Sequence, residues 1–287
     1  MKDRPEARAL ALTLAALVSF ALNSLLCRAA LGPELIDPWT FTLVRLGSGA
    51  AVLFVLVHNS KSARPPASLT IKDRIFSAVA LFLYALPFSL AYARIATGTG
   101  AFVVFGCVQV TMIGSDLFSG RSLRRQEAVG LGIALIGLGW LTRPGVESPD
   151  PSGVLLMAVS GVSWGIYSLR GRFAGPPVEA SARNFAAAVP LAVVASGFAL
   201  PAVHLSAKGL VLALLSGAFT SGLGYVAWYA ALPSLSATRA SIVQLAVPPL
   251  AAALGIVFLG ETLTPRLMTG APMILGGIAL AVTNLRR

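Results

Sequence analysis

The chain has 287 residues, of which 56% are hydrophobic and only 11% are charged, and its mean hydropathy is +0.81. Soluble domains carry about 25% charged residues, so this composition excludes a soluble globule and predicts an integral membrane protein. The formal net charge is +11. The basic residues lie in short loops and form no continuous patch, which argues against a nucleic-acid partner. Cys27 and Cys107 lack the CxxC spacing of a disulfide framework or zinc site.

A bilayer core about 30 Å thick requires roughly 20 apolar residues per helix. Windows of that size, bounded by charges, prolines or glycines, predict ten transmembrane helices at residues 8–30, 38–58, 75–95, 99–119, 126–142, 152–173, 182–203, 208–231, 236–259 and 265–285. The first window follows charged residues, as in a signal peptide. Its apolar part is longer, and nine similar segments follow, so we expect a retained helix.

The distribution of lysine and arginine predicts the orientation of these helices. Ten spans place both termini on one side of the membrane. Sixteen of the 22 basic residues lie on that side, five lie on the other, and Arg45 lies within the second span. Because cytoplasmic loops carry the excess of basic residues, both termini are expected in the cytoplasm.

The two halves of the chain are similar to each other at an offset of 140 residues. The matching pairs are Gly120 with Gly260, Ser122 with Thr262, Leu123 with Leu263, Gly130 with Gly270 and Gly137 with Gly277. We therefore expect a first five-helix repeat over 1–142, an external linker over 143–151 and a second repeat over 152–287. Because five is odd, the repeats cross the membrane in opposite senses. Such inverted repeats are typical of secondary transporters, whose substrate lies near the midplane.

Several motifs resemble an EamA-type domain of the drug/metabolite transporter superfamily. They are Ser236-Ala237-Thr238, Pro248-Pro249, the stretch 259–264 (LGETLT), a glycine-rich final helix, and Ser163-Trp164-Gly165. The resemblance spans the chain but is clearer in the second half. The first half departs from the pattern at Asn23, Gln109-Val110 and Gly120-Arg121. Within the superfamily, the resemblance implies an exporter of aromatic and other amino acids of bacterial inner membranes.

Motifs for enzyme chemistry are almost absent from the sequence. Residues 161–165 (GVSWG) fit the GxSxG pattern of a nucleophile elbow, but that pattern requires a strand-turn-helix and a histidine partner. Here it lies inside an apolar span, and His58 and His204 lie in different loops. We expect no enzyme, no cofactor and no metal site.

Polar side chains within membrane spans are the first candidates for a binding site. Asn23 lies in the middle of the first span, and Gln109 and Gln244 lie at matching places in spans four and nine. The two glutamines can bind substrate from both halves of the molecule. An interhelical bond is the alternative for all three amides.

Aromatic residues with a polar group are concentrated in spans three, six and eight. Trp164 and Tyr167 are three residues apart, and hence on one helix face. The aromatic candidates for substrate binding are Tyr84, Tyr92, Trp164, Tyr167, Tyr225 and Trp228. Packing between helices is the alternative for each. A cavity lined by rings and amides, with no evident buried charge pair, suits a neutral or zwitterionic organic molecule better than an ion.

Arg45 and Asp116 are candidates for gating or coupling. Arg45 can instead snorkel or pair with the external Asp37 or Glu34, and Asp116 can pair with Arg121 or Arg124. Glu261, at the end of the ninth span, is expected to cap a helix or anchor a loop.

Prolines and glycines predict where the helices bend and where they pack closely. Kinks are expected at Pro87, Pro190, Pro248, Pro249 and Pro272. Glycines in spans five and ten allow close approach of backbones, so these spans are expected to support a cavity lined by spans 1, 3, 4, 6, 8 and 9.

The sequence as a whole predicts a secondary transporter in the bacterial inner membrane. The expected activity is export of aromatic or other neutral amino acids, or related metabolites, by alternating access around a central cavity. Export of drugs, nucleosides or other solutes is an open alternative, and an intramembrane enzyme or a channel is another.

Overall fold

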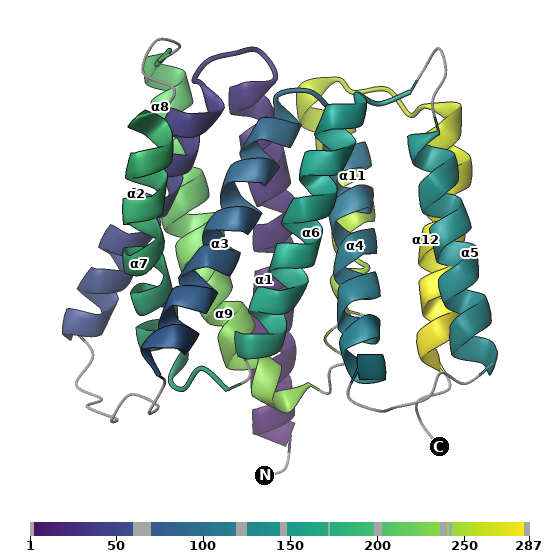
Figure 1. The fold of residues 1–287 in the computed structure, drawn as a ribbon, viewed down its shortest axis with the longest axis horizontal. Helices are drawn as coiled ribbons and strands as arrows, with labels where there is room; N and C mark the ends of the chain where they lie inside the picture. The colour runs from purple at the N-terminus through teal and green to yellow at the C-terminus, as the bar shows by residue number, and fades with distance from the viewer. Residues whose placement is uncertain are drawn as a thin grey trace.

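The computed structural model describes residues 3–59, 70–118, 125–143, 148–171, 173–197, 203–235, 240 and 243–283. They form a single bundle of helices (Figure 1), with no β-strand in these ranges beyond an isolated bridge between Ile36 and Leu205. The helices are α1 (Asp3–Leu31), α2 (Pro38–Asn59), α3 (Ile71–Tyr92), α4 (Thr97–Phe118), α5 (Arg125–Thr142), α6 (Pro151–Gly171), α7 (Pro177–Gly197), α8 (Ala207–Leu215), η2 (Ser216–Leu223), α9 (Gly224–Ala231), η3 (Leu232–Ser234), α11 (Val247–Leu259) and α12 (Pro265–Thr283).

Seven helical stretches of the described chain are long and apolar enough to cross a membrane. They are Ala7–Leu31, Pro38–Asn59, Ile71–Tyr92, Thr97–Ser115, Pro151–Gly171, Pro177–Gly197 and Ala207–Ser234. This all-helical architecture agrees with the predicted multi-pass membrane protein. α5, α11 and α12 are helices within the other three predicted windows but are not among the seven, so the count of ten spans stays a prediction.

α3 and α7 begin several residues before their predicted windows because local capping outweighs hydropathy. α3 begins at Ile71 rather than 75: the Thr70 side chain accepts from the Asp73 backbone N–H, and the Asp73 carboxylate accepts from the Thr70 N–H. This capping box satisfies N–H groups that a helix start leaves open. α7 begins at Pro177 rather than 182, because proline is preorganised for the first helical position.

The predicted ninth span is broken near its middle, where a continuous helix over 236–259 is wrong. Residues 245 and 246 form a turn, and α11 begins at Val247 with its two prolines in the first turn. Proline lacks the N–H that an interior position needs and disfavours helical geometry in the residue before it, so Pro248 and Pro249 start a helix here. The remaining predicted prolines, Pro87, Pro190 and Pro272, lie inside helices.

The predicted eighth span contains a long π-helix. η2 is continuous with α8 and α9 and replaces the ordinary helical turns over Ser216–Leu223. It packs tightly on α2 because Gly217 has no side chain: an added Cβ would collide with the Ser48 hydroxyl and the Arg45 carbonyl. π-Helical turns are rare and often mark functional sites.

α5 and α12 pack along each other at one edge of the bundle (Figure 1). An added Cβ at Gly277 would lie 2.5 Å from the Ala134 backbone nitrogen, so the close contact requires glycine. The pair shares a small core of its own with one residue of α4: its members are Phe102 of α4, Ala134 and Leu141 of α5, and Leu267, Ile274 and Ile278 of α12. The main core, with most of the rings, lies among the other helices. The supporting role of spans five and ten stays a prediction.

Candidate substrate site

A buried arginine lies at the centre of the polar contacts in the main core. Arg45, on α2, is only 1% exposed. Its Nε donates to Ser221 Oγ (2.8 Å), and its Nη2 donates to the hydroxyls of Tyr225 (2.8 Å) and Tyr84 (3.2 Å). Its Nη1 lies 4.0 Å from Cys27 Sγ. One guanidinium therefore ties together α1, α2, α3, η2 and α9.

Asn23 extends this network into α1. Its Nδ2 donates to Tyr84 Oη (3.3 Å), and its Oδ1 accepts from Ser216 Oγ (2.7 Å) and Thr220 Oγ1 (3.1 Å). Tyr84 Oη is thus an acceptor shared by Asn23 and Arg45. We call these residues the Asn23–Arg45 network: Asn23, Cys27, Arg45, Tyr84, Ser216, Thr220, Ser221 and Tyr225.

The π-helix brings three members of the network to one place. Ser216, Thr220 and Ser221 all belong to η2 and are buried. The wider π-helical turn changes the angular spacing of successive side chains, so Ser216 and Thr220 reach Asn23 while Ser221 reaches Arg45. These three residues are not among the binding residues that the sequence predicts. The available signal was a cluster of hydroxyl and glycine residues, 216–222 (SGAFTSG), inside an otherwise apolar span.

Aromatic rings enclose the network on the side of α6. The Trp164 ring centroid lies 4.7 Å from that of Tyr225 and 4.8 Å from that of Tyr84, and Phe20 stands edge-on to Trp164 at 5.2 Å. Trp164 and Tyr167 stack with centroids 5.6 Å apart, which confirms that they share a helix face. Edge-on and tilted pairs of this kind are favourable ring geometries.

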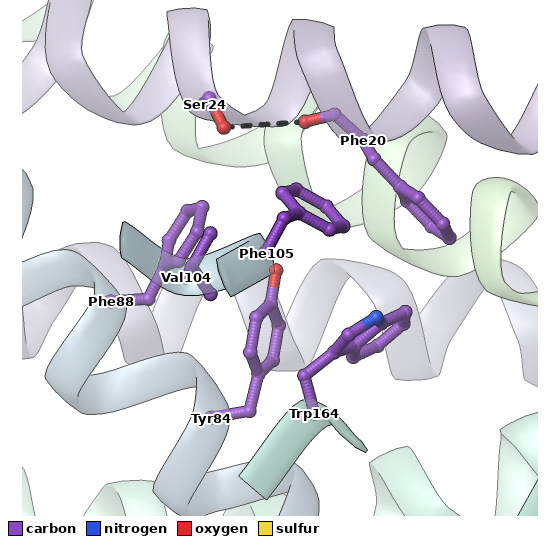
Figure 2. Close-up of a pocket in the computed structure, with 7 residues that line it drawn as sticks. All are labelled: Phe20, Ser24, Tyr84, Phe88, Val104, Phe105 and Trp164. Carbon is purple, nitrogen blue, oxygen red and sulfur yellow. Dashed lines mark hydrogen bonds between the residues drawn. The ribbon is translucent and has the colours of Figure 1, made fainter. Parts of the chain in front are cut away.

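Figure 2 shows a small cavity among these rings, with the Tyr84, Phe105 and Trp164 side chains turned toward one another. Its volume is about 10 Å³, and its walls are Phe20, Ser24, Tyr84, Phe88, Val104, Phe105 and Trp164. This volume holds about one water molecule, whereas pockets for organic ligands occupy roughly 300–1,000 Å³. The helices must therefore separate before a metabolite can enter.

Gln244 and Gln109, the two predicted substrate-binding amides of spans nine and four, lie in different surroundings. Gln244 Oε1 accepts from Trp164 Nε1 (3.0 Å), and its Nε2 donates to the Ala240 carbonyl (3.0 Å). Gln109 is fully buried but lines a separate cavity of about 10 Å³ between α4, α5 and α12, with Leu138 and Ile274 among its walls. Spans four and nine correspond in sequence, but the break before α11 allows Gln244 to approach Trp164.

The remaining aromatic candidates lie around the network rather than in it. Tyr167 accepts from Asn184 Nδ2 (3.3 Å), and Trp228 Nε1 donates to Ser168 (3.2 Å). Tyr92 lies at the end of α3, where its hydroxyl donates to the Thr97 carbonyl (3.4 Å). The side chain of Asp116 lies outside the described residues, as do Arg121 and Arg124, so its predicted pairing is untested.

The predicted pairing of Arg45 with Asp37 or Glu34 is wrong. The Asp37 carboxylate accepts from the backbone N–H groups of Trp39 and Thr40 instead, at the start of α2. Within the described part of the chain, no carboxylate oxygen lies within 4.0 Å of the Arg45 guanidinium. Arg45 is too deeply buried to snorkel, because its side chain points into the core and not along it to an interface.

An ion pair lies toward each end of the bundle. At the end opposite the start of α1, Glu261 accepts from the Thr97 N–H (2.9 Å) and lies 3.5 Å from Arg28 Nε, as expected for a loop anchor. At the other end, Arg170 of α6 pairs with Asp73 of α3 at 2.5 Å. The described residues include no group of three or more His, Cys, Asp or Glu side chains placed to hold a metal ion.

The comparisons with known proteins agree with this architecture. Residues 151–283 match the model of the EamA-like transporter family. An uncharacterized protein of Pseudomonas aeruginosa is 46% identical over 276 residues, which are 96% of this chain and 95% of that protein. The chain belongs to the EamA-like transporter family. It is accordingly a multi-pass membrane transporter rather than an enzyme, with a small-molecule substrate.

Other similar proteins bear on the cargo and the fold. The threonine/homoserine exporter RhtA of Escherichia coli is 34% identical over 157 residues, 52% of this chain and 51% of that exporter. A transporter of Archaeoglobus fulgidus is 26% identical over 205 residues, 70% of this chain and 73% of that protein. A crystal structure matches the fold with a TM-score of 0.69 at 20% identity, covering 95% of this chain and 98% of that one.

Proposed function

We propose that this EamA-family chain is a secondary transporter that exports amino acids, aromatic or other neutral ones, or related small metabolites. It works by alternating access of two inverted five-helix halves in the bacterial inner membrane, with both termini in the cytoplasm. The observation that carries the proposal is the Asn23–Arg45 network, a buried polar centre enclosed by rings. Partial similarity to an amino-acid exporter supports the cargo class.

The packing of the helices supports two inverted halves. If α1 to α5 correspond to α6, α7, α8–α9, α11 and α12, contacts should recur under that exchange. The contact of α6 with α3 corresponds to the contact of α1 with η2 and α9, and both are present. The contact of α6 with α4 corresponds to the contact of α1 with α11, and both of these are present too. α2 with α7 and α5 with α12 are contacts that the exchange maps onto themselves. The start of α1 and the end of α12 lie at the same end of the bundle, as ten crossings require (Figure 1).

The site draws on both halves, as alternating access demands. Asn23, Arg45 and Tyr84 come from the first half, and Trp164 and Tyr225 come from the second. Relative movement of the halves separates these groups and opens the small cavity between them. The π-helix η2 and the break before α11 supply the irregular backbone that transporters place next to their substrates. The same site is the reason to prefer amphipathic cargo over an inorganic ion.

Counterflow in liposomes tests the proposal. Purified protein should exchange labelled for unlabelled amino acid with saturation and without electrical conductance. Continuous conductance would instead indicate a channel, and release of a reaction product would indicate an enzyme. A screen with labelled drugs and nucleosides tests the competing cargo classes, because the proposal fails if these are exchanged and no amino acid is.

A substitution at Trp164 tests selection of aromatic cargo. Ring stacking contributes about 0.5–1.5 kcal/mol beyond burial, so Trp164→Ala should weaken transport of phenylalanine by up to about tenfold more than transport of threonine. The matched control is Trp140→Ala, because Trp140 lies on α5, away from the network, and is 44% exposed. An equal loss for both substrates that follows protein abundance would assign Trp164 to packing alone.

A further inference from the structure

Among the described residues, no carboxylate lies within ion-pair distance of the buried guanidinium of Arg45. Three carboxylates of the described chain have partners of their own: Asp37 binds backbone N–H groups at the start of α2, Asp73 pairs with Arg170, and Glu261 pairs with Arg28. In the described ranges the polar partners of the guanidinium are hydroxyls and one thiol. An ionised side chain inside a membrane protein is expensive and commonly marks the path of a substrate or ion.

Neutral groups stabilise this charge only in part. The guanidinium carbon lies 5.2 Å from the ring centroids of both Tyr84 and Phe88, which is within range of a cation–π contact. Rings and hydroxyls help to solvate a cation, but they supply no negative charge. A buried charge that has lost its partner strongly destabilises a protein. An anion that binds next to the buried guanidinium of Arg45 supplies such a partner and is therefore bound favourably.

The network presents donors rather than acceptors to an incoming group. Tyr84 and Tyr225 each accept from the guanidinium, and a hydrogen bond joins their two hydroxyls, so one phenolic proton of the pair remains to be donated. The amide oxygen of Asn23 is already occupied by two hydroxyl donors, from Ser216 and Thr220. A set made of guanidinium and hydroxyl protons fits an acceptor-only group, and a carboxylate is one.

The charged centre and the ring-lined cavity share walls. Tyr84 and Phe88 stand over the guanidinium and also line the cavity beside Trp164 (Figure 2). When the helices separate, a molecule in the enlarged cavity can hold its polar end at Arg45 and its side chain among the rings. This arrangement matches a small molecule that carries a carboxylate at one end.

We infer that Arg45 is a specificity-determining residue that binds the carboxylate of the cargo, so that the transporter selects carboxylate-bearing metabolites and excludes amines that lack a carboxylate. This inference rests on the proposed function. The inference narrows the cargo class in two ways. Arg45 repels an amine cation that has no carboxylate. An uncharged solute leaves the positive charge of Arg45 without an anion.

The test compares amino acids with their carboxamides. Binding of L-phenylalanine, L-threonine and the corresponding amides to the full-length protein is measured in detergent micelles by thermal shift, and counterflow is measured in liposomes. The variants are Arg45→Gln and Arg45→Lys. The matched control is Arg94→Gln, because Arg94 is a half-exposed arginine at the end of the bundle, paired with Asp150.

The wild type and Arg94→Gln should prefer the acids over the amides by at least about tenfold, the ratio that corresponds to 1.4 kcal/mol. Arg45→Gln should lose that preference by weakening the acids only, and Arg45→Lys should retain part of it, since an ammonium keeps the charge without the two-pronged geometry. Equal loss for acids and amides, an unchanged preference in Arg45→Gln, or a wild type that binds both equally would overturn the inference.

The two readouts separate this inference from the proposed function. Arg45-dependent binding of acids without counterflow would support the carboxylate site and refute the transport proposal. Counterflow with no carboxylate preference would support transport and overturn the role of Arg45. If Arg45→Gln does not accumulate in the membrane, Arg45→Lys and the wild-type preference for acids decide the question.

Discussion

Trp164 joins α6 to the segment just before α11 through a buried hydrogen bond whose energy a double-mutant cycle can measure. Its Nε1 donates to Gln244 Oε1 at 3.0 Å, and both side chains are at most 2% exposed. Trp164→Phe keeps a ring in place but leaves the Gln244 oxygen without this donor, which should cost about 1–3 kcal/mol of stability. Gln244→Met leaves the indole N–H without its acceptor and should cost a similar amount.

The double variant replaces both partners by apolar groups and removes the unsatisfied atoms. It should therefore be less destabilised than the sum of the single variants, with a coupling energy of about 0.5–3 kcal/mol. The assay is reversible unfolding in micelles, followed by the Trp fluorescence that remains. Trp140→Phe with Thr269→Val is the control cycle, because that hydrogen bond is exposed. Additive costs for Trp164 and Gln244 would refute the described geometry.

Three further predictions concern packing, the closed end of the bundle and pH. Gly217→Ala should lower the free energy of unfolding by about 1–3 kcal/mol, because the added Cβ overpacks against α2. Gly47→Ala is the control and should not lower it, because no atom lies within 4 Å of the added Cβ. The melting temperatures of the two variants are compared. Glu261→Gln weakens the ion pair with Arg28 and the hydrogen bond from Thr97. The substrate site should then be more accessible from the end of the bundle where Glu261 lies, which is measured as faster labelling of a thiol in the site by a reagent added on that side. Hydrogen bonds from Ser152 lower the pKa of Asp150 in the folded protein. A carboxylate with a lowered pKa stabilises the fold fully above its pKa in the unfolded chain, and this stabilisation is lost as the pH falls further. The destabilisation caused by Ser152→Ala, measured as the difference in melting temperature from the wild type, should therefore shrink below about pH 4.

Hydropathy was sufficient to place most helices but not to describe their irregular parts. The windows for α2 and α6 agree closely with the structure because both are long apolar runs with charged or proline-containing ends. A hydropathy window does not distinguish a π-helix from an α-helix, since both bury the same apolar residues, so η2 was not predicted. The prolines at 248 and 249 were visible in the sequence, but whether they kink a helix or start one depends on the turn before them.

The candidate site was predictable in its residue types and less so in its contacts. Helical spacing places Trp164 and Tyr167 on one face, and rarity within apolar spans selects Asn23 and Arg45. The partners of Arg45 come from four other helical elements, α1, α3, η2 and α9, so no local pattern identifies them. The internal repeat predicts that Gln109 and Gln244 bind substrate from both halves, which stays a prediction; their different surroundings follow from the turn before α11, which no residue pairing in the repeat indicates.

Thiol labelling of the cavity from each side of the membrane tests alternating access most directly. In protein with Cys27→Ser and Cys107→Ser, Ser24→Cys introduces a thiol at a cavity wall. Ile274→Cys, buried in the core of α5 and α12, is the matched control. A membrane-impermeant reagent should label position 24 from either side, and added L-amino acid should change the two rates in opposite directions, while position 274 stays unlabelled. Equal labelling from both sides that cargo does not alter, or labelling from one side only, would contradict transport through this site.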